Sequence, residues 1–135
     1  MSQENVEVVR RMLQAFADGG LDAMAEFADP DIEFVAVGGP QPGAWSGLAG
    51  MAEGWREWLS AWEDFRQEVD EYRELDDERV LVLFRMFGRG RTSGLDLAQM
   101  HPLSAGVFHV RDGRVTRFIG YFDHERALEA VGLRE

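Results

Sequence analysis

The chain has 135 residues, 45% of them hydrophobic and 29% charged, which predicts one folded domain over residues 1–135. A formal net charge of −11 disfavours nucleic acid and anionic membrane surfaces as partners, because both are polyanions. The absence of cysteine excludes disulfides, thiol nucleophiles and thiolate metal sites.

The first 31 residues predict two short helices. Apolar residues recur at helical spacing over 4–17, and the pattern stops at Gly19-Gly20. A second helix is predicted over 21–27, ended by a turn at Asp29-Pro30-Asp31. The N-terminal segment lacks the basic and apolar regions of a signal peptide. No apolar run approaches the ~20 residues of a membrane span. The absence of cysteine fits a cytoplasmic protein, which is what we expect.

The middle of the chain predicts a strand, a loop and a third helix. Residues 32–37 have strand character, and residues 38–47 predict a loop because they hold four glycines and two prolines. A helix is predicted over 48–62, with Gly50 and Gly54 in places where close packing is expected. Its apolar face comprises Leu48, Met51, Trp55, Trp58, Leu59 and Trp62.

The C-terminal half predicts strands over 65–75, 79–92, 97–111 and 114–122. Asp112-Gly113 indicates a hairpin between the last two, and Asp123 is a suitable N-cap for a final helix over 124–131. Helices followed by antiparallel strands indicate the α+β class, with a curved, mostly antiparallel sheet wrapped around the N-terminal helices. Such a sheet, closed by the tryptophan-bearing helix, forms a cone whose open end suits a small ligand.

Several short motifs occur in order along almost the whole chain. They are Ala28-Asp29-Pro30-Asp31-Ile32-Glu33, Trp45-Ser46-Gly47, Gly88-Arg89-Gly90-Arg91-Thr92-Ser93-Gly94, Arg111-Asp112-Gly113-Arg114-Val115 and Tyr121-Phe122-Asp123. In these motifs the chain resembles the SnoaL-like branch of the nuclear transport factor 2-like superfamily. The resemblance implies a cone-shaped α+β barrel, a fold that hosts isomerases, cyclases, epoxide hydrolases, dehydratases and non-catalytic binding proteins.

The same resemblance makes Gly120 conspicuous. Polyketide cyclases of the family carry an acid/base aspartate on the last strand, and aligning their pattern on Asp112-Gly113 places that aspartate at Gly120. Glycine has no side chain that can move a proton, so the resemblance implies that the cyclase acid/base group is replaced here. Alternatively, the glycine relieves strain where the strand bends.

His101 and Asp123 are the catalytic candidates, because proton transfer at neutral pH needs such groups. A two-residue type I′ loop at Asp112-Gly113 would place His101 and His109 on the side of Gly120. A three-residue loop with a bulge would instead turn Gly106 and Phe108 inward. For Asp123 the alternative is a purely structural N-cap.

We expect an apolar pocket over Gly120. The ligand-binding candidates are Phe34, Trp45, Trp58, Trp62, Met86, His109, Phe118, Gly120 and Phe122. Tryptophans at helical spacing also suit a packed core. On another strand, Arg85 can pair with Glu68 or Asp70 across the sheet.

The predicted ligand is a small hydrophobic or oxygenated molecule. No metal-ligand spacing or phosphate-binding loop is present, so we expect neither a metal nor a cofactor. The protein is then either an isomerase, cyclase or hydrolase-type enzyme using proton transfer, or a non-catalytic ligand-binding or dimerisation module. The outward positions Ile119 and Tyr121 predict a homodimer.

Overall fold

The structure is a computed structural model that describes residues 2–38, 42–97 and 104–132. Its helices and strands confirm the α+β class. They are, in chain order, α1 (Ser2–Met24), the 3₁₀ helix η1 (Ala25–Phe27), β1 (Ala28–Val37), β2 (Gly43–Ser46), α2 (Gly47–Ser60), β3 (Trp62–Glu74), β4 (Arg79–Gly90), β5 (Ser104–Arg111), β6 (Arg114–Tyr121) and α4 (His124–Ala130). No helix within these residues is long and apolar enough to cross a membrane.

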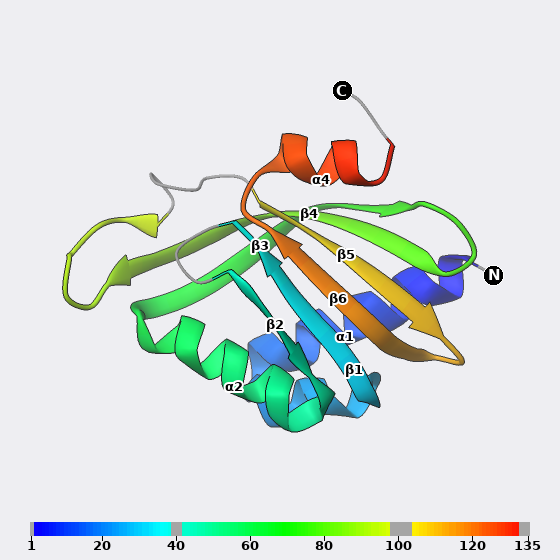
Figure 1. Ribbon diagram of the computed structural model, residues 1–135, viewed down its shortest axis with the longest axis horizontal. Coiled ribbons are helices and arrows are strands. Elements are labelled where there is room, and N and C mark those ends of the chain that lie inside the picture. Colours follow the sequence, from blue (N-terminus) through cyan, green and yellow to red (C-terminus); the bar gives the residue numbers. More distant parts are fainter. Residues whose placement is uncertain (1, 39–41, 98–103, 133–135) are drawn as a thin grey trace.

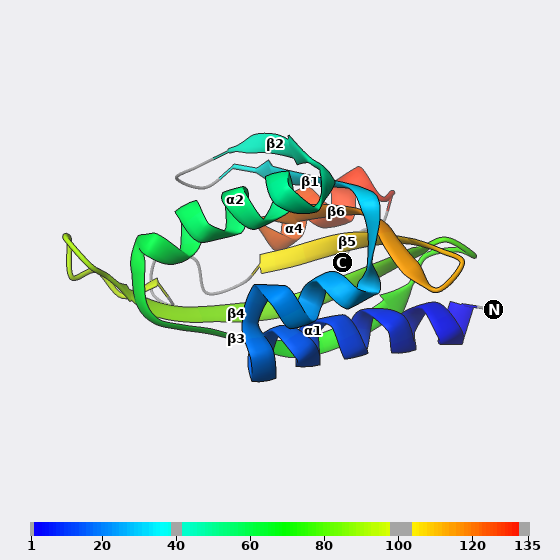
Figure 2. The same cartoon turned by 90° about the horizontal axis from the view of Figure 1, so that it is seen from below.

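A single curved sheet organises the molecule. Its strand order is β2-β1-β6-β5-β4-β3, with β1 and β6 parallel and the other neighbours antiparallel. The long strands β3 and β4 curl so that the sheet forms the wall of a cone, as predicted. Helices α1 and α2 cover the concave face, and α4 lies against the opposite, outer face (Figures 1 and 2).

Two apolar clusters hold these layers together. The larger cluster lies between the concave face and α1 and α2, with Val9, Met12 and Met51 among its most buried members. The smaller cluster lies on the outer face, where Ala127 and Leu128 of α4 cover Leu81 and Val107. The inward side chains of β1, β4, β5 and β6 therefore point towards the helices. A ligand site can form in the space between these strands and the helices.

The predicted helix break at Gly19-Gly20 is confirmed. Gly20 has φ 78° and ψ −160°, a backbone conformation that is essentially restricted to glycine, and α1 kinks there. The last turn of α1 therefore runs in a different direction from the first five turns. This change of direction shapes a groove on the side of α1 that faces β3.

Three predicted boundaries are wrong. The predicted turn at 29–31 belongs to β1, where the pairing with β6 is irregular and Asp29 accepts a hydrogen bond from the Asp31 N–H. The predicted loop 38–47 contains β2, because Ala44 and Trp45 pair with β1. The third helix ends at Ser60, so Trp62 belongs to β3. Of the predicted strand 97–111, residues 98–103 lie outside the described residues.

The β5–β6 hairpin combines features of both predicted alternatives. Asp112 (φ 52°) and Gly113 (φ 77°) form a two-residue loop with positive φ at both positions, as a type I′ turn requires. An extra residue, Thr116, then shifts the register, so that Gly106 faces Gly120 and Phe108 faces Phe118. The bulge therefore turns Gly106 and Phe108 inward although the loop has only two residues.

Candidate ligand-binding site

A small cavity of about 60 Å³ lies on the concave face of the sheet, under α2. All six strands of the sheet contribute lining residues, and α2 contributes Gly54, Trp55 and Trp58. The lining residues are Phe34, Ala36, Trp45, Gly54, Trp55, Trp58, Gln67, Phe84, Met86, Ser104, Phe118, Gly120, Tyr121 and Phe122. The lining is predominantly aromatic, and among the described residues it contains no carboxylate, arginine or histidine.

Phe34 is at the centre of the aromatic wall. Its ring lies 5.3 Å from the Trp45 ring, 5.7 Å from the Trp55 ring and 5.3 Å from the Phe118 ring, measured between centroids. The rings of Phe34 and Trp55 are nearly parallel, at 14°. These are the offset arrangements that aromatic pairs prefer, so the wall is a stable surface on which a flat molecule can stack.

Glycines create the space that this wall encloses. A Cβ on Gly120 would lie 3.9 Å from the Phe118 ring and 4.0 Å from the Val35 carbonyl oxygen, so this lining position could take a Cβ without a clash. Gly54 serves a different purpose, because a Cβ there would lie 2.8 Å from Trp45 Cδ2. Close packing was predicted for both helix glycines; at Gly50 the nearest atom would be 3.5 Å away, which is ordinary contact.

Two buried polar atoms of the lining residues have no hydrogen-bond partner among the described residues. They are the acceptor Gln67 Oε1 and the donor Trp55 Nε1. Ser104 differs, since its Oγ donates to the Phe84 carbonyl oxygen at 3.3 Å. A buried polar atom without a partner typically costs about 1–3 kcal/mol, so both atoms favour a molecule that satisfies them.

The cavity brings together seven of the nine predicted ligand-binding residues. These are Phe34, Trp45, Trp58, Met86, Phe118, Gly120 and Phe122. Trp62 and His109 lie elsewhere. Trp62, on β3, is only 6% exposed and lies outside the cavity lining. Its ring packs on the Trp58 ring, with the two centroids 5.3 Å apart.

Sequence reasoning missed the other seven lining residues, which include Tyr121, a residue expected to point outward. They are Ala36, Gly54, Trp55, Gln67, Phe84, Ser104 and Tyr121. Trp55 was assigned to the apolar core of the helix. It packs in the core and also lines the cavity, because α2 turns it towards Phe34. Gln67 lies between Phe65 and Val69 in a period of two on β3, which is the signal that places it on the inner face. A polar residue in an otherwise apolar alternation marks a position that reaches a site.

The sequence profile of the SnoaL-like domain matches residues 9–118, which include most of the chain and most of the cavity wall. The chain belongs to the SnoaL-like family. No curated protein matches it.

Solved structures agree with this family at the level of the fold. An NTF2-like protein of unknown function from Burkholderia pseudomallei has a TM-score of 0.73 at 20% identity, covering 95% of this chain and 97% of that chain. TerC, crystallised with polyporic acid, has a TM-score of 0.71 at 24% identity, covering 96% and 98%. A candidate polyketide cyclase from Xanthomonas campestris has a TM-score of 0.68 at 24% identity, covering 96% and 98%.

Of the two catalytic candidates in this SnoaL-like protein, only Asp123 lies within the described residues. Asp123 is exposed and accepts a hydrogen bond from the Glu125 N–H at 2.9 Å, as the N-cap of α4. His101 lies outside the described residues. Within those residues, no three histidine, aspartate or glutamate side chains form a set that could hold a metal ion.

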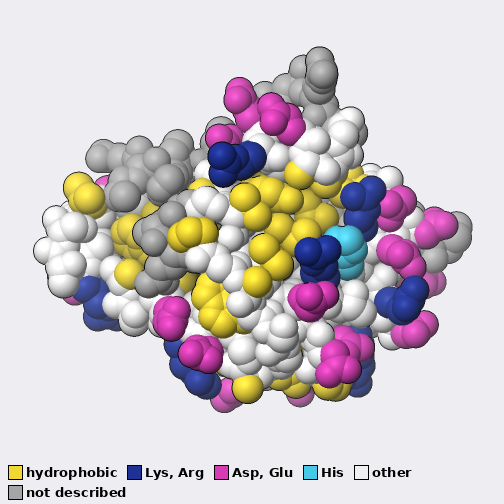
Figure 3. Space-filling model, in the orientation of Figure 1, with side chains coloured by type: hydrophobic (Ala, Val, Ile, Leu, Met, Phe, Trp, Pro, Cys, Tyr) yellow, Lys and Arg dark blue, Asp and Glu magenta, His cyan; other side chains and the backbone are white. Residues whose placement is uncertain are grey.

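His109 lies on the outer face of the SnoaL-like sheet, not in the cavity. The bulge at Thr116 pairs it with Arg117 and turns it away from Gly120. Figure 3 shows hydrophobic side chains gathered on this face below α4, over β5 and β6. Ile119 and Tyr121 belong to the same outer cluster and are partly buried against it. The homodimer built on these two residues remains a prediction.

The pKa of His109 is lowered from its ordinary value of 6.5, first by burial and then by the charges of Arg117 and Arg79, against smaller opposing effects of Asp76 and Glu78. Below pH 6.5 the unfolded chain therefore binds more protons at this site than the folded protein. His109 thus makes stability fall as the pH drops through that range. We expect His109→Gln to lose less stability than the parent between about pH 7.5 and about pH 5.5, measured by urea unfolding.

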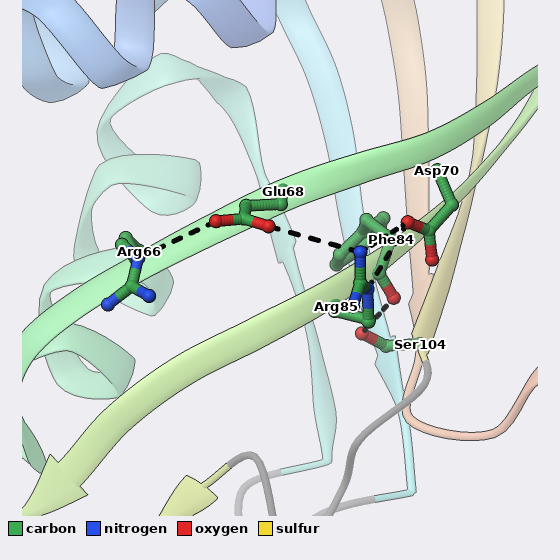
Figure 4. A network of polar contacts seen from close by, with 6 residues as sticks. All are labelled: Arg66, Glu68, Asp70, Phe84, Arg85 and Ser104. Atoms are coloured by element: carbon green, nitrogen blue, oxygen red, sulfur yellow. Dashed lines mark hydrogen bonds and ion pairs between the residues drawn. The ribbon is translucent and has the colours of Figure 1, made fainter.

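Charged side chains form a separate network on the outer side of β3 and β4 (Figure 4). Arg85 Nη2 lies 3.0 Å from Asp70 Oδ1 and 3.9 Å from Glu68 Oε1, which confirms the predicted pairing. Arg85 alternates with the cavity residues Phe84 and Met86, so it faces away from the cavity. Side-chain exposures between 36% and 52% limit each pair to under ~1 kcal/mol.

Proposed function

We propose that this SnoaL-like protein binds a small, flat, largely apolar molecule that carries an oxygen group, in the cavity over Gly120. One observation carries the proposal: two residues that line the aromatic cavity, Gln67 and Trp55, each hold a buried polar atom, the acceptor Oε1 and the donor Nε1, that has no partner among the described residues. A phenol or enol hydroxyl can donate to the first and accept from the second. Polyporic acid in TerC supports a small-molecule ligand for this fold.

The size of the cavity bears on how such a ligand enters. About 60 Å³ holds roughly two water molecules, at ~30 Å³ each in the liquid, so a ring system needs more room. Three aromatic residues of the lining are partly buried: Trp45, Tyr121 and Phe122. Tyr121 also packs against the outer cluster, which leaves Trp45 and Phe122 as the side chains that can move. Trp45 comes from the short edge strand β2, and Phe122 directly follows β6. We propose that these two side chains rotate outward when a ligand enters.

Proton-transfer catalysis is the second candidate function. The supporting observation is that Ser104 lines the cavity. The catalytic candidate His101 precedes Ser104 by only three residues in the sequence. Asp123 is one residue beyond the lining residue Phe122. Hydrogen–deuterium exchange at the α-carbon of 2-tetralone, followed by NMR, separates the two candidates. Exchange above the buffer rate that is lost in His101→Ala supports an enzyme, and no such exchange supports a binding protein.

The hydrogen bond to Gln67 gives a direct test of the binding proposal. We expect the parent protein to bind 2-naphthol about tenfold more tightly than 2-methoxynaphthalene, since only the naphthol donates a hydrogen bond. Gln67→Leu removes the acceptor and leaves a branched apolar side chain that is one bond shorter, so this preference is expected to disappear. Isothermal titration calorimetry measures both affinities.

Gln14→Leu is the matched control, because it makes the same chemical change on an exposed residue of α1 that does not line the cavity. It is expected to leave the tenfold preference intact. A preference that survives in Gln67→Leu would show that Gln67 does not contact the ligand, and the proposed orientation would be wrong.

A further inference from the structure

A second, larger hollow lies between α1, α2 and β3, and we name it the α1–β3 groove. Its volume is about 680 Å³, within the range of roughly 300–1,000 Å³ that is usual for ligand pockets. Figure 2 shows α1 running alongside β3 and β4 on the concave side of the sheet. The kink at Gly20 bends the end of α1, and Gly19, Gly20 and Leu21 line that end of the groove.

The groove is separate from the aromatic cavity. Gln67 is the one described residue that lines both, so its side chain forms part of the wall between them. One side of the groove is apolar, with Leu13 and Phe16 from α1, Leu59 from α2 and Phe65 from β3. All four are partly buried against the main core cluster, so they offer a fixed apolar surface rather than mobile side chains.

The charge of the groove is opposite to that of the whole chain. Its lining includes Arg10, Arg56 and Arg66 but only one carboxylate, Asp22, a net charge of +2. The chain as a whole has a net charge of −11, so an anion is repelled by most of the surface and attracted here. The chain contains no lysine, so its cationic side chains at neutral pH are arginines, whose planar guanidinium matches a carboxylate with two parallel hydrogen bonds.

The three arginines of the groove differ in the ion pairs and ring contacts that their guanidinium groups make. Arg10 Nη1 lies 3.2 Å from Glu7 Oε2, and its guanidinium lies over the Tyr72 ring at 5.3 Å. Arg66 stacks over the Phe87 ring at 4.2 Å. Arg56 is exposed and has no ion pair or hydrogen bond among the described residues. Its charge is therefore available to a ligand.

We infer that the α1–β3 groove binds a small amphipathic monocarboxylate, with its apolar body against Leu13, Phe16 and Leu59 and its carboxylate on Arg56. This site goes beyond the proposed function, since it requires neither the aromatic cavity nor any chemistry at Gly120. The bounded volume, the apolar side and the local excess of guanidinium groups together favour an amphipathic anion over a neutral ligand.

Octanoate is a suitable probe, with octanol as its uncharged counterpart. By isothermal titration calorimetry we expect octanoate to bind the full-length protein at least about tenfold more tightly than octanol, and less tightly as salt increases. Arg56→Met is expected to weaken octanoate binding about tenfold. Arg11→Met is the matched control: it removes the same charge from an exposed residue of α1 that does not line the groove.

Two further variants locate the bound octanoate. Ala17 is exposed on α1 and lines the groove, so Ala17→Phe is expected to fill it and abolish octanoate binding without unfolding the helix. Gly120→Val fills the aromatic cavity and is expected to leave octanoate binding within about twofold. The inference is overturned if octanoate does not bind, if Arg56→Met and Arg11→Met weaken binding equally, or if Gly120→Val abolishes binding while Ala17→Phe does not.

Discussion

Replacing Gly120 by valine is expected to abolish the binding of 2-naphthol while the protein keeps its fold. The side chain added at this position projects into the space that the cavity provides, where the nearest heavy atoms are Phe118 Cε1 and Cζ at 3.9 Å from the Cβ. A cavity of about 60 Å³ cannot hold both the valine methyl groups and a ligand ring. We expect an affinity loss of at least about 100-fold, because the ligand loses its entire binding space.

The fold should tolerate Gly120→Val for two reasons. Gly120 does not have a positive φ, so its backbone accepts any residue, and valine suits a strand better than glycine. The opposing glycine, Gly106, provides the matched contrast. A Cβ there would lie 2.8 Å from Phe118 Cε1 and 3.0 Å from Phe108 Cε1. Gly106→Ala is therefore expected to lower the free energy of unfolding by about 1–3 kcal/mol, as overpacking does.

Urea unfolding and calorimetric titration of the same preparations check this prediction. The expected pattern is unchanged stability with no binding for Gly120→Val, and reduced stability for Gly106→Ala. If Gly120→Val were to bind 2-naphthol with the parent affinity, the ligand would have to occupy another site, and the proposed function would fail. If Gly106→Ala were neutral, the packing of Phe108 on Phe118 would be looser than the distances indicate.

The inner face of the last strand was predictable from the sequence because its determinants are local. The alternation of β6 places Phe118 and Gly120 on one face, and the lack of a side chain at Gly120 indicates a hollow whatever strand lies next to it. The aromatic residues Phe34, Trp45 and Trp58 were also predictable, since each belongs to an amphipathic element or a neighbouring loop. Local patterning therefore predicts most of the cavity wall.

The position of His109 was not predictable because it depends on a pairing detail. A single extra residue, Thr116, moves the β5 partner of every later β6 residue by one position, which exchanges the two faces of β5 relative to that part of β6. Nothing in the hairpin sequence requires a bulge there, since the turn itself has the expected two residues. The edge strand β2 was missed for a related reason: Gly43 and Ala44 have little strand propensity, and the pairing of this segment with β1 defines the strand.

Phe118→Ala is expected to cause the largest loss of stability, about 3–5 kcal/mol, as the removal of buried aromatic rings does. Phe118 is 4% exposed and packs between the Phe108 ring at 4.3 Å, the Phe34 ring at 5.3 Å and the Trp55 ring at 6.1 Å. These neighbours come from β5, β1 and α2, so one side chain joins the sheet to the helix. Small domains are stable by only about 5–15 kcal/mol, and the loss is a large share of that.

Phe87→Ala is the matched control for this substitution. Phe87 is on β4, is only partly buried and contacts the Arg66 guanidinium rather than the ring cluster. Its removal is expected to cost about 1 kcal/mol, and both losses should appear in the urea midpoint without a change in slope. A loss at Phe118 no larger than the loss at Phe87 would mean that Phe34 and Trp55 close over the vacated space. The aromatic wall would then be compliant, and a ring ligand could enter the cavity by displacing wall residues instead of the rim residues Trp45 and Phe122.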